Sequence, residues 1–231
     1  MVTLVIEHLE PVMTPWIFLE YKHAASIVDN LVVTNVREER ERECLKPFVN
    51  VLEESIGELA SKDEILVLDP RAGRPLQPWD FRNFSYIVIG GIMGDFPPRG
   101  RTKALLTDRL KAEARTLGSC QFSVDGAVYV AAKLERGVAD IFVAQGVTVR
   151  GGGVEVRLPY CYPVDSGKVV FSCELASYIL SLLEDDEAYA AREGLPRSIA
   201  DYGCRLELPK VEYVVSAGRL LNLADLMRSA P

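Results

Sequence analysis

The sequence lacks the features of secreted, membrane-spanning and metal-binding proteins. Its two histidines, His8 and His23, are too few for a histidine-rich metal site, and its five cysteines contain no C-x-x-C pair. No apolar run reaches the roughly 18 residues that span a bilayer, and the amino-terminal apolar run has no basic lead. We therefore expect free, partly buried thiols, no metal site, no association with a membrane and a cytoplasmic location.

The fingerprints of several enzyme classes are also missing. The chain contains no G-x-G-x-x-G, no G-x-x-x-x-G-K-[ST], no H-E-x-x-H and no G-x-S-x-G. Rossmann, P-loop, hydrolase and metalloenzyme assignments therefore lose their usual support. The formal net charge of −7 disfavours a protein that coats nucleic acid through its phosphates, although it permits a local basic site.

The composition is that of an ordinary globular protein. A chain of 231 residues with 48% hydrophobic and 26% charged residues can bury one sizeable core. Strand-like and helix-like segments alternate along it, which predicts an α/β fold. The predicted strands are 2–6, 31–34, 65–68 and 86–89, and the predicted helices are 14–29, 46–60, 102–117 and 125–136. We expect a core of residues 1–145 and a small carboxy-terminal appendage of residues 146–231.

The appendage changes character. The glycine triplet Gly151–Gly153 stands between two short β-rich runs and predicts a hairpin over about 148–158. A helix over 173–183 follows, and we expect the acidic run 184–187 to end it. A late strand at 211–215 and a short closing helix at 220–227 complete the expected elements of this hairpin and helical segment on the substrate side.

Two of the predicted strands run straight into loops of unusual composition. The strand 65–68 is followed by Asp69-Pro70-Arg71-Ala72-Gly73, and the strand 86–89 by Gly90-Gly91-Ile92-Met93-Gly94-Asp95. In an open α/β sheet, ligands bind outside the carboxyl ends of the parallel strands, where both loops fall. Glycine has no Cβ atom and lets the backbone approach a ligand closely. We therefore expect a binding site at this edge of the sheet.

Four separated motifs resemble those of one enzyme family. They are Ile6-Glu7-His8-Leu9-Glu10, Leu68 to Ala72, the run G-G-I-M-G-D-F-P-P-R-G-R-T over 90–102, and the stretch from Gly118 to Ala127. In this order they resemble SPOUT-class (α/β-knot) methyltransferases that use S-adenosyl-L-methionine. The family concerned contains the fungal ribosomal-protein arginine methyltransferase and archaeal relatives often labelled RNA methyltransferases. The resemblance covers roughly residues 1–180, and the role of the segment after about residue 184 is open.

The resemblance implies a parallel sheet whose carboxy-terminal part is threaded as a trefoil knot and flanked by helices. It also implies that three loops at the knot hold the methyl donor, S-adenosyl-L-methionine, with the apolar Leu68, Ile92 and Phe122 walling its ring. The residues carried over as the donor site are Leu68, Asp69, Pro70, Arg71, Ala72, Gly90, Gly91, Ile92, Gly94, Asp95, Arg99, Arg101, Thr102, Gly118, Phe122, Ser123, Asp125 and Ala127.

Methylation of an arginine needs a carboxylate near the donor. The pKa of a guanidinium exceeds about 12, so its lone pair is unavailable until a carboxylate polarises it or takes a proton. The catalytic candidates are Asp95, Glu10 and Glu7, which lie at strand ends or in the second loop. The alternative for these acids is a capping or salt-bridge role. Arg99 and Arg101 could contact the donor carboxylate or an acceptor phosphate, or be solvated.

Three functions follow from these patterns. The first is methylation of an arginine in a ribosomal protein, a basic partner that suits the acidic balance of the chain. The second is methylation of ribosomal or transfer RNA, which a basic groove would favour. The third is a non-catalytic module that binds the donor, which a pocket blocked by side chains would favour and the glycines of the second loop disfavour. The identity of the acceptor, the methylated atom, and the choice between a monomer and a knot-mediated dimer stay open.

Overall fold

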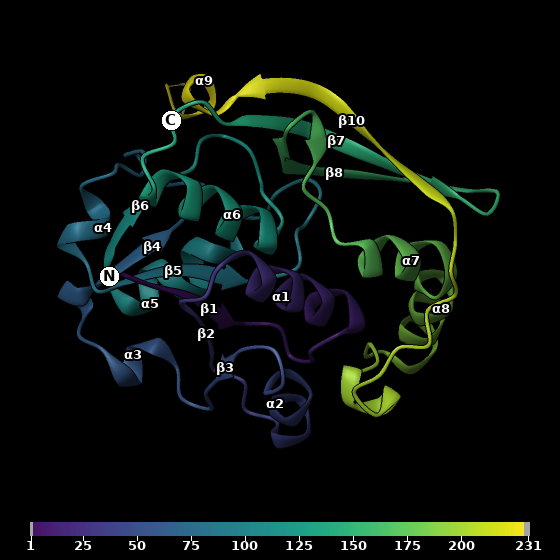
Figure 1. The fold of residues 1–231 in the computed structure, drawn as a ribbon. Coiled ribbons are helices and arrows are strands. Elements are labelled where there is room, and N and C mark those ends of the chain that lie inside the picture. Colours follow the sequence, from purple (N-terminus) through teal and green to yellow (C-terminus); the bar gives the residue numbers. More distant parts are fainter. Residues whose placement is uncertain (1, 229–231) are drawn as a thin grey trace.

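The computed structural model describes residues 2–228, which form two sheets and their connecting helices (Figure 1). The first sheet has six parallel strands in the order β3-β2-β1-β5-β4-β6. Its strands are β1 (Thr3–His8), β2 (Leu31–Thr34), β3 (Asn50–Val51), β4 (Ile65–Leu68), β5 (Tyr86–Gly91) and β6 (Glu113–Arg115). The α/β fold with a parallel sheet is thus confirmed, while its knotted threading stays a prediction.

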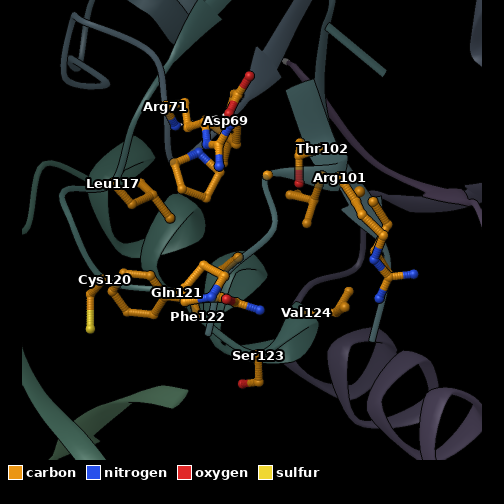
Figure 2. A pocket seen from close by; sticks show the side chains of 18 of the residues that line it. Asp69, Arg71, Arg101, Thr102, Leu117, Cys120, Gln121, Phe122, Ser123 and Val124 are labelled. Carbon is orange, nitrogen blue, oxygen red and sulfur yellow. Dashed lines mark hydrogen bonds between the residues drawn. The ribbon is translucent and has the colours of Figure 1, made fainter. Parts of the chain in front are cut away.

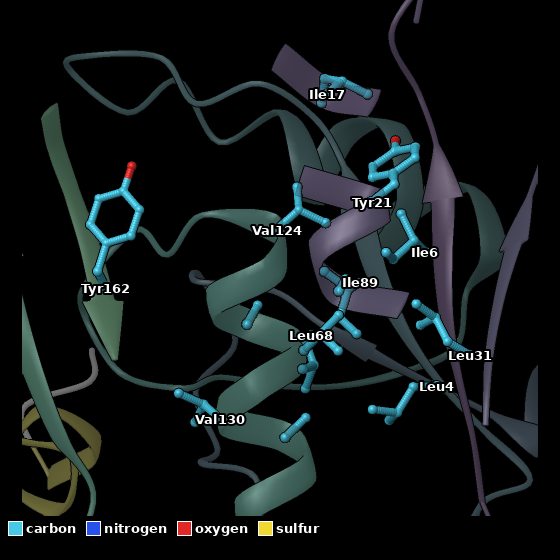
Figure 3. Packing of buried hydrophobic residues seen from close by; sticks show 14 of the residues in the cluster. Leu4, Ile6, Ile17, Tyr21, Leu31, Leu68, Ile89, Val124, Val130 and Tyr162 are labelled. Atoms are coloured by element: carbon cyan, nitrogen blue, oxygen red, sulfur yellow. The ribbon is translucent and has the colours of Figure 1, made fainter. Parts of the chain in front are cut away.

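Both faces of this sheet are covered, which explains why its strands are apolar on both sides. Leu66 and Leu68 of β4 belong to the larger core on one face, whereas Ile65 and Val67 belong to a smaller core on the other. Helices α1 (Pro15–Ile27) and α6 (Val124–Glu135) contribute to the larger core (Figure 3). The smaller core takes in α3 (Ile56–Leu59) and the π-helical turn that precedes α5 (Asp108–Leu110).

Helix α1 begins where the sequence predicts. The hydroxyl of Thr14 accepts a hydrogen bond from the amide of Ile17, and Pro15 occupies the first helical position. Proline fits there because the first amides of a helix have no partner within the helix. Several side chains of this helix are buried, among them Trp16 and Tyr21, so α1 is anchored in the core along much of its length.

Two of the predicted helices are wrong in extent. The segment 46–60 begins just after α2 (Glu39–Leu45) ends and contains β3 and α3, because Pro47 cannot continue the helical hydrogen bonds and Ser55 caps a new helix. The segment 102–117 is helical only to Leu110, after which Lys111 takes a left-handed conformation. Residues 113–115 then pair with β4, so pairing with the sheet outweighs their helical spacing.

The second sheet is antiparallel, with the order β10-β7-β8-β9. Its strands are β7 (Phe142–Gly151), β8 (Val154–Asp165), β9 (Lys168–Val169) and β10 (Tyr213–Asn222). The predicted hairpin is confirmed and is longer than expected. Strand β7 starts at Phe142, so the expected boundary between residues 145 and 146 falls inside a strand. Strand β10 returns along β7, as Figure 1 shows in yellow and teal, and leads into α9 (Leu223–Arg228).

The acidic run 184–187 starts a helix instead of ending one. Helix α7 (Cys173–Ser181) closes before it, and α8 (Leu183–Glu193) opens with Glu184, Asp185 and Asp186 in its first turn. Carboxylates are favourable there because the helix dipole places partial positive charge at the amino end. Helix α4 (Asp80–Asn83) lies between β4 and β5 in the chain.

The chain after α8 is held against the parallel-sheet core. Ile199 is fully buried, and its amide donates to the carbonyl of Met13 over 2.8 Å. The hydroxyl of Ser198 donates to the carboxylate of Glu41 over 2.6 Å, and that buried carboxylate also accepts from the Met13 amide. A disulfide between Cys44 of α2 and Cys204 adds a covalent tie to the same region.

The expectation of free thiols is therefore wrong for four of the five cysteines. Cys44 pairs with Cys204 and Cys120 with Cys161, and Cys173 is free and exposed. Sequence separations of 160 and 41 residues give no local spacing signal, so only the fold reveals these pairs. Such bonds are rare in the cytosol of mesophiles but common inside hyperthermophiles, and the cytoplasmic location stays a prediction. No helix within residues 2–228 is long and apolar enough to cross a membrane.

Candidate active site

A cavity of about 240 Å³ lies at the carboxyl ends of β5, β4 and β6, which are neighbours in the sheet. Three loops wall it, one after each strand, and they correspond to the three predicted loops (Figure 2). This is the edge where ligands bind in open α/β sheets. Figure 2 shows Arg71 and Leu117 on one side of the cavity and Arg101 with Thr102 on the other.

Most of the predicted donor-site residues come together at this cavity. Those that line it are Leu68, Asp69, Pro70, Arg71, Gly90, Ile92, Asp95, Arg99, Arg101, Thr102, Gly118, Phe122, Ser123 and Ala127. Four predicted residues lie outside the lining, namely Ala72, Gly91, Gly94 and Asp125. Lining residues that sequence reasoning missed include Ile89, Leu117, Cys120, Gln121 and Val124. Ile89 lies near the end of β5, and the others lie in or beside the third loop. Their closeness to predicted site residues in the sequence was the only signal that could have identified them.

The first loop is shaped by a buried carboxylate. Asp69 is 2% exposed, and its two oxygens accept hydrogen bonds from the amide of Arg71 over 2.8 Å and the hydroxyl of Thr107 over 2.7 Å. Its own amide donates to the carbonyl of Arg115 at the end of β6. These bonds fix the turn that presents Arg71 to the cavity. Asp69 thus fixes the conformation of the first loop and also contributes to the cavity wall.

The glycines Gly90, Gly91 and Gly94 of the second motif have two different roles. Gly90 and Gly91 continue β5, so the second loop starts at Ile92 instead of Gly90. Gly90 lines the cavity. A Cβ atom on Gly91 would strike the hydroxyl of Tyr21, and one on Gly94 would strike the Tyr160 ring and the Gln121 amide. The expectation that both Gly91 and Gly94 leave room for a ligand is therefore corrected, because protein side chains occupy that room.

The third loop is held from two sides. Cys120 of the loop is bonded to Cys161 of β8, and the amide of Cys161 donates to the carbonyl of Gln121 over 2.8 Å. On the other side, α9 packs against Gly118, where an added Cβ atom would lie 2.7 Å from the carbonyl carbon of Leu226. The carboxy-terminal strands and helix therefore support a wall of the cavity.

The amino terminus of α6 completes that wall. Its cap is Ser123, whose hydroxyl accepts from the amide of Gly126 over 3.2 Å, whereas the sequence predicted a helix that starts at Asp125. Asp125 lies inside the helix, is 1% exposed and meets Nδ1 of His23 over 2.6 Å. Ser123 is the cap because it directly precedes the first helical residue, Val124, and has an extended backbone.

A second buried carboxylate holds α6 from behind. The oxygens of Glu20 accept from Nε1 of Trp16 over 2.8 Å and from the amide of Val124 over 3.1 Å. Burial, and next the nearby charge of Asp125, raise the pKa of Glu20 to about 8. The carboxyl group is therefore largely protonated at neutral pH, which avoids two negative charges beside each other.

Asp95 and Glu10 meet at one edge of the cavity, where Arg101 lies between them. Its Nε donates to Asp95 over 2.7 Å, its Nη1 donates to Glu10 over 2.9 Å, and its Nη2 donates to the carbonyl of Met93. Asp95 lines the cavity, and Glu10 stands behind it, bound also to the Met93 amide over 2.8 Å. The guanidinium of Arg101 thus uses each of its nitrogens for this cluster, and Arg99 lines the cavity as an exposed neighbour.

Glu7 lies apart from the cavity. It is 2% exposed and accepts hydrogen bonds from the hydroxyls of Thr34 and Ser55, both over 2.5 Å, and from the Ile56 amide over 3.0 Å. Such contacts cap the start of α3 and match the structural alternative for this residue. The neighbouring His8 is buried against the hydroxyl of Tyr21 at 2.9 Å, and burial lowers its pKa to about 4.

Metal ligation has no support among the described residues, since nowhere in 2–228 do three or more histidine, cysteine, aspartate or glutamate side chains gather in a way that could hold an ion. The cavity instead combines apolar walls with a few charged groups. Leu117, Phe122 and Ile92 are apolar, and Arg71, Asp95 and Arg101 are charged. This combination is typical of a pocket for a small organic molecule that carries charges of both signs.

Comparison with known proteins gives a consistent result. Residues 3–186 match the model of a family described as protein arginine N-methyltransferase SFM1-like. Protein arginine N-methyltransferase SFM1 of Saccharomyces cerevisiae is 33% identical over 141 residues, which are 54% of this chain and 66% of the relative. The matched stretch thus spans just under two thirds of that relative's length.

Two solved structures of the yeast arginine methyltransferase SFM1 share the fold. The complex with SAH has a TM-score of 0.68 and 29% identity, and covers 77% of this chain and 94% of that one. The complex with SAM also has a TM-score of 0.68, with 27% identity over 77% of this chain and 89% of that one. Both similarities cover more than three quarters of this chain.

Proposed function

This chain belongs to the SFM1-like family of protein arginine N-methyltransferases, and we propose that it transfers a methyl group from S-adenosylmethionine to an arginine side chain of a protein. One structural observation carries the proposal beyond family membership. A cavity walled by three loops at the carboxyl ends of neighbouring strands has a carboxylate, Asp95, on its wall. The cavity supplies a place for the donor, and the carboxylate supplies a group that can act on an arginine.

The residues of the cavity fit the donor. The purine of the donor can pack against the apolar side chains of Leu117 and Phe122, and the small Ala127 also lines the cavity. Its carboxylate suits a guanidinium, which Arg71 and Arg99 offer. When bound, the donor supplies an electrophilic methyl group on a positively charged sulfur. Everything else in the reaction falls to the side chains and backbone of this chain.

The first task of the chain toward the acceptor is positioning. Methyl transfer requires the acceptor nitrogen in line with the methyl group, so a fixed approach supplies much of the acceleration. The second task is to handle the acceptor proton, because a guanidinium has no free lone pair near neutral pH. Asp95 is the proposed base, and Glu10 behind it stabilises the positive charge of the acceptor.

We infer further that the acceptor arginine belongs to a ribosomal protein. The formal net charge of −7 favours a basic partner over a polyanion. Methylation of ribosomal or transfer RNA is the alternative, and it would need several lysines or arginines to neutralise phosphates near the cavity. A module that binds the donor without turnover is disfavoured by the carboxylate of Asp95 on the cavity wall, because donor binding alone does not need a group that acts on an acceptor.

The test is a methyl-transfer assay with radiolabelled donor, ribosomal protein and purified RNA. We expect label in protein and on arginine after acid hydrolysis, with negligible label in RNA. Asp95→Asn should lower turnover strongly, by about 10²–10⁴-fold, because an amide cannot take the proton. Asp108→Asn is the matched control, since Asp108 is exposed and pairs with Lys103 away from the cavity wall.

Label in RNA with none in protein would overturn the arginine acceptor and leave donor binding standing. Equal turnover by the wild type and Asp95→Asn would remove Asp95 as the base. Donor binding without transfer to either class of acceptor would favour the non-catalytic module.

A further inference from the structure

The guanidinium of Arg101 is recognised in the way that a bound arginine ligand would be. Each of its three nitrogens donates to a different acceptor, which are the carboxylates of Asp95 and Glu10 and the carbonyl oxygen of Met93. These acceptors come from two separate segments of the chain, the segment that follows β1 and the second loop. A planar fork of N–H donors matches such a set, whereas the compact ammonium of lysine cannot reach all three acceptors at once.

This cluster lies at the edge of the cavity proposed for the donor. Asp95 and Arg101 both line the cavity, and the side chains of Arg101, Asp95 and Glu10 are 31%, 25% and 14% exposed. The cluster is therefore partly exposed and borders the cavity. An acceptor arginine that approaches the donor from solvent would meet these same carboxylates.

The acceptor atoms are held in place by bonds that do not involve Arg101. The Met93 amide donates to Glu10, and the hydroxyl of Tyr160 donates to the carbonyl of Gly94 over 2.7 Å. The amide of Gln121, oriented to satisfy both of its polar atoms, donates to the Asp95 carbonyl over 3.2 Å and accepts from the Asp95 amide over 3.3 Å. The backbone from 93 to 95 is thus fixed from three sides, so Arg101 can leave without collapse of the site.

From these contacts we propose that Glu10, Asp95 and the Met93 carbonyl form the binding site for the acceptor guanidinium, and that Arg101 occupies this site until an acceptor arginine displaces it. The inference rests on the proposed function, which it deepens by naming the acceptor subsite and the residue that guards it. Arg101 follows Gly100, whose left-handed backbone (φ +73°) sets the turn from which the side chain leaves the loop.

Charge explains why the exchange favours arginine. With Arg101 withdrawn, two carboxylates at the cavity edge lack a cation, which costs free energy until another cation arrives. An acceptor guanidinium restores the charge balance and all three hydrogen bonds, whereas an acceptor lysine restores the charge but not the bonds. Exchange of one guanidinium for another therefore selects arginine over lysine at little net cost.

The test uses ethylguanidinium as the probe and butylammonium as its lysine-like counterpart. Calorimetry should show that the full chain with Arg101→Gln binds ethylguanidinium about tenfold more tightly than the wild type, because no internal competitor remains. The gain should be smaller for butylammonium and should vanish in Arg101→Gln/Asp95→Asn. Arg109→Gln, which removes an exposed arginine of α5, is the matched control and should leave the affinity for ethylguanidinium unchanged.

A measurement on the wild type covers the case in which Arg101→Gln fails to fold. Saturating ethylguanidinium should shift the NMR signal of the Arg101 Nε–H to that of a solvated arginine. Equal affinity of the folded variant and the wild type for ethylguanidinium would overturn the proposal, as would an Arg101 signal that the probe leaves unmoved. Neither measurement uses donor or turnover, so a failure of methyl transfer would be distinguished from a failure of this inference.

Discussion

The hydroxyl of Tyr21 fills the space that a Cβ atom on Gly91 would need. Tyr21 is fully buried in α1, and its hydroxyl also bonds Nδ1 of His8, the residue that pairs with Gly91 across β1 and β5. The glycine therefore belongs to a contact between helix and sheet beneath the site. Its neighbour Gly90 faces a different environment, where a Cβ atom would touch Ile92 and Thr102 of the cavity wall at 3.3 and 3.7 Å.

We expect Gly91→Ala and Gly90→Ala to separate stability from ligand affinity. Gly91→Ala should lower the free energy of unfolding by about 1–3 kcal/mol, since the new methyl overpacks against Tyr21. Gly90→Ala should change stability little and should weaken the binding of SAH, because the methyl narrows the cavity. Urea unfolding and calorimetry on both variants would measure the two effects. The opposite assignment, with Gly91→Ala affecting affinity alone, would contradict the described contact.

The cavity should bind SAH at one site per chain. Calorimetry with the isolated protein should give this stoichiometry, and EDTA should leave the affinity unchanged, because the predicted site has no metal ligand set. Phe122→Ala should weaken the binding by removing an apolar wall. Absence of heat at millimolar SAH would refute the assignment of the cavity to the donor.

Stability should depend on pH through Glu20. Its folded pKa of about 8 lies above the ordinary value of 4.5, so the native state keeps a proton that the unfolded chain releases. This stabilisation is complete below about pH 4.5 and is lost as pH rises toward 8. His8 has the reverse sign, with a folded pKa of about 4 below the ordinary 6.5, so its contribution is lost as pH falls from 6.5 toward 4.

The window from pH 6.5 to 8 therefore isolates Glu20 from His8. Urea unfolding should show the wild type losing stability across this window, whereas Glu20→Gln, which is neutral at every pH, should lose clearly less. Parallel slopes for the two proteins would show that Glu20 is ionised in the folded state throughout.

The two disulfides should have separable effects. Cys204→Ser breaks the tie to Cys44 and should lower the free energy of unfolding by about 2–4 kcal/mol, with faster proteolysis after α8 and unchanged affinity for SAH. Cys120→Ser should alter SAH affinity as well, since Cys120 lines the cavity. The exposed, free Cys173 provides the control, and Cys173→Ser should change neither quantity. Equal loss of SAH affinity in Cys204→Ser and Cys120→Ser would contradict this separation.

Sequence reasoning succeeded where adjacent residues determine the outcome. Thr14 and Pro15 specify the start of α1 by their own cap chemistry, and the apolar run 65–68 is a strand because it must be buried on both faces. The loops after β4 and β5 follow directly from those strands, so most of the predicted donor-site residues lie at one cavity. The resemblance to the family supplied the third loop, and the family is confirmed by the match over residues 3–186.

Sequence reasoning failed where a contact with a residue distant in the sequence determines the role of a residue. Gly90 and Gly91 are indistinguishable in sequence, and only the position of Tyr21 separates a cavity wall from a packing contact. Glu7 resembles a catalytic acid until Ser55, which is 48 residues away, is found to donate to it. Residues 113–115 have helical spacing, but they form a strand because they pair with the open edge of β4. No local pattern encodes such partners.

The position of β5 in the parallel sheet affects how the protein folds and how a ligand protects it from proteolysis. β5 lies between β1 and β4, and Thr3 pairs with Tyr86, so the sheet closes through contacts between residues far apart in the chain. Such contacts form slowly, and the loops around the cavity cannot meet before the strands do. A ligand of this cavity therefore binds the completed sheet and not the open chain, and stabilises it by mass action. Bound ligand should then slow any proteolysis that proceeds through the unfolded chain.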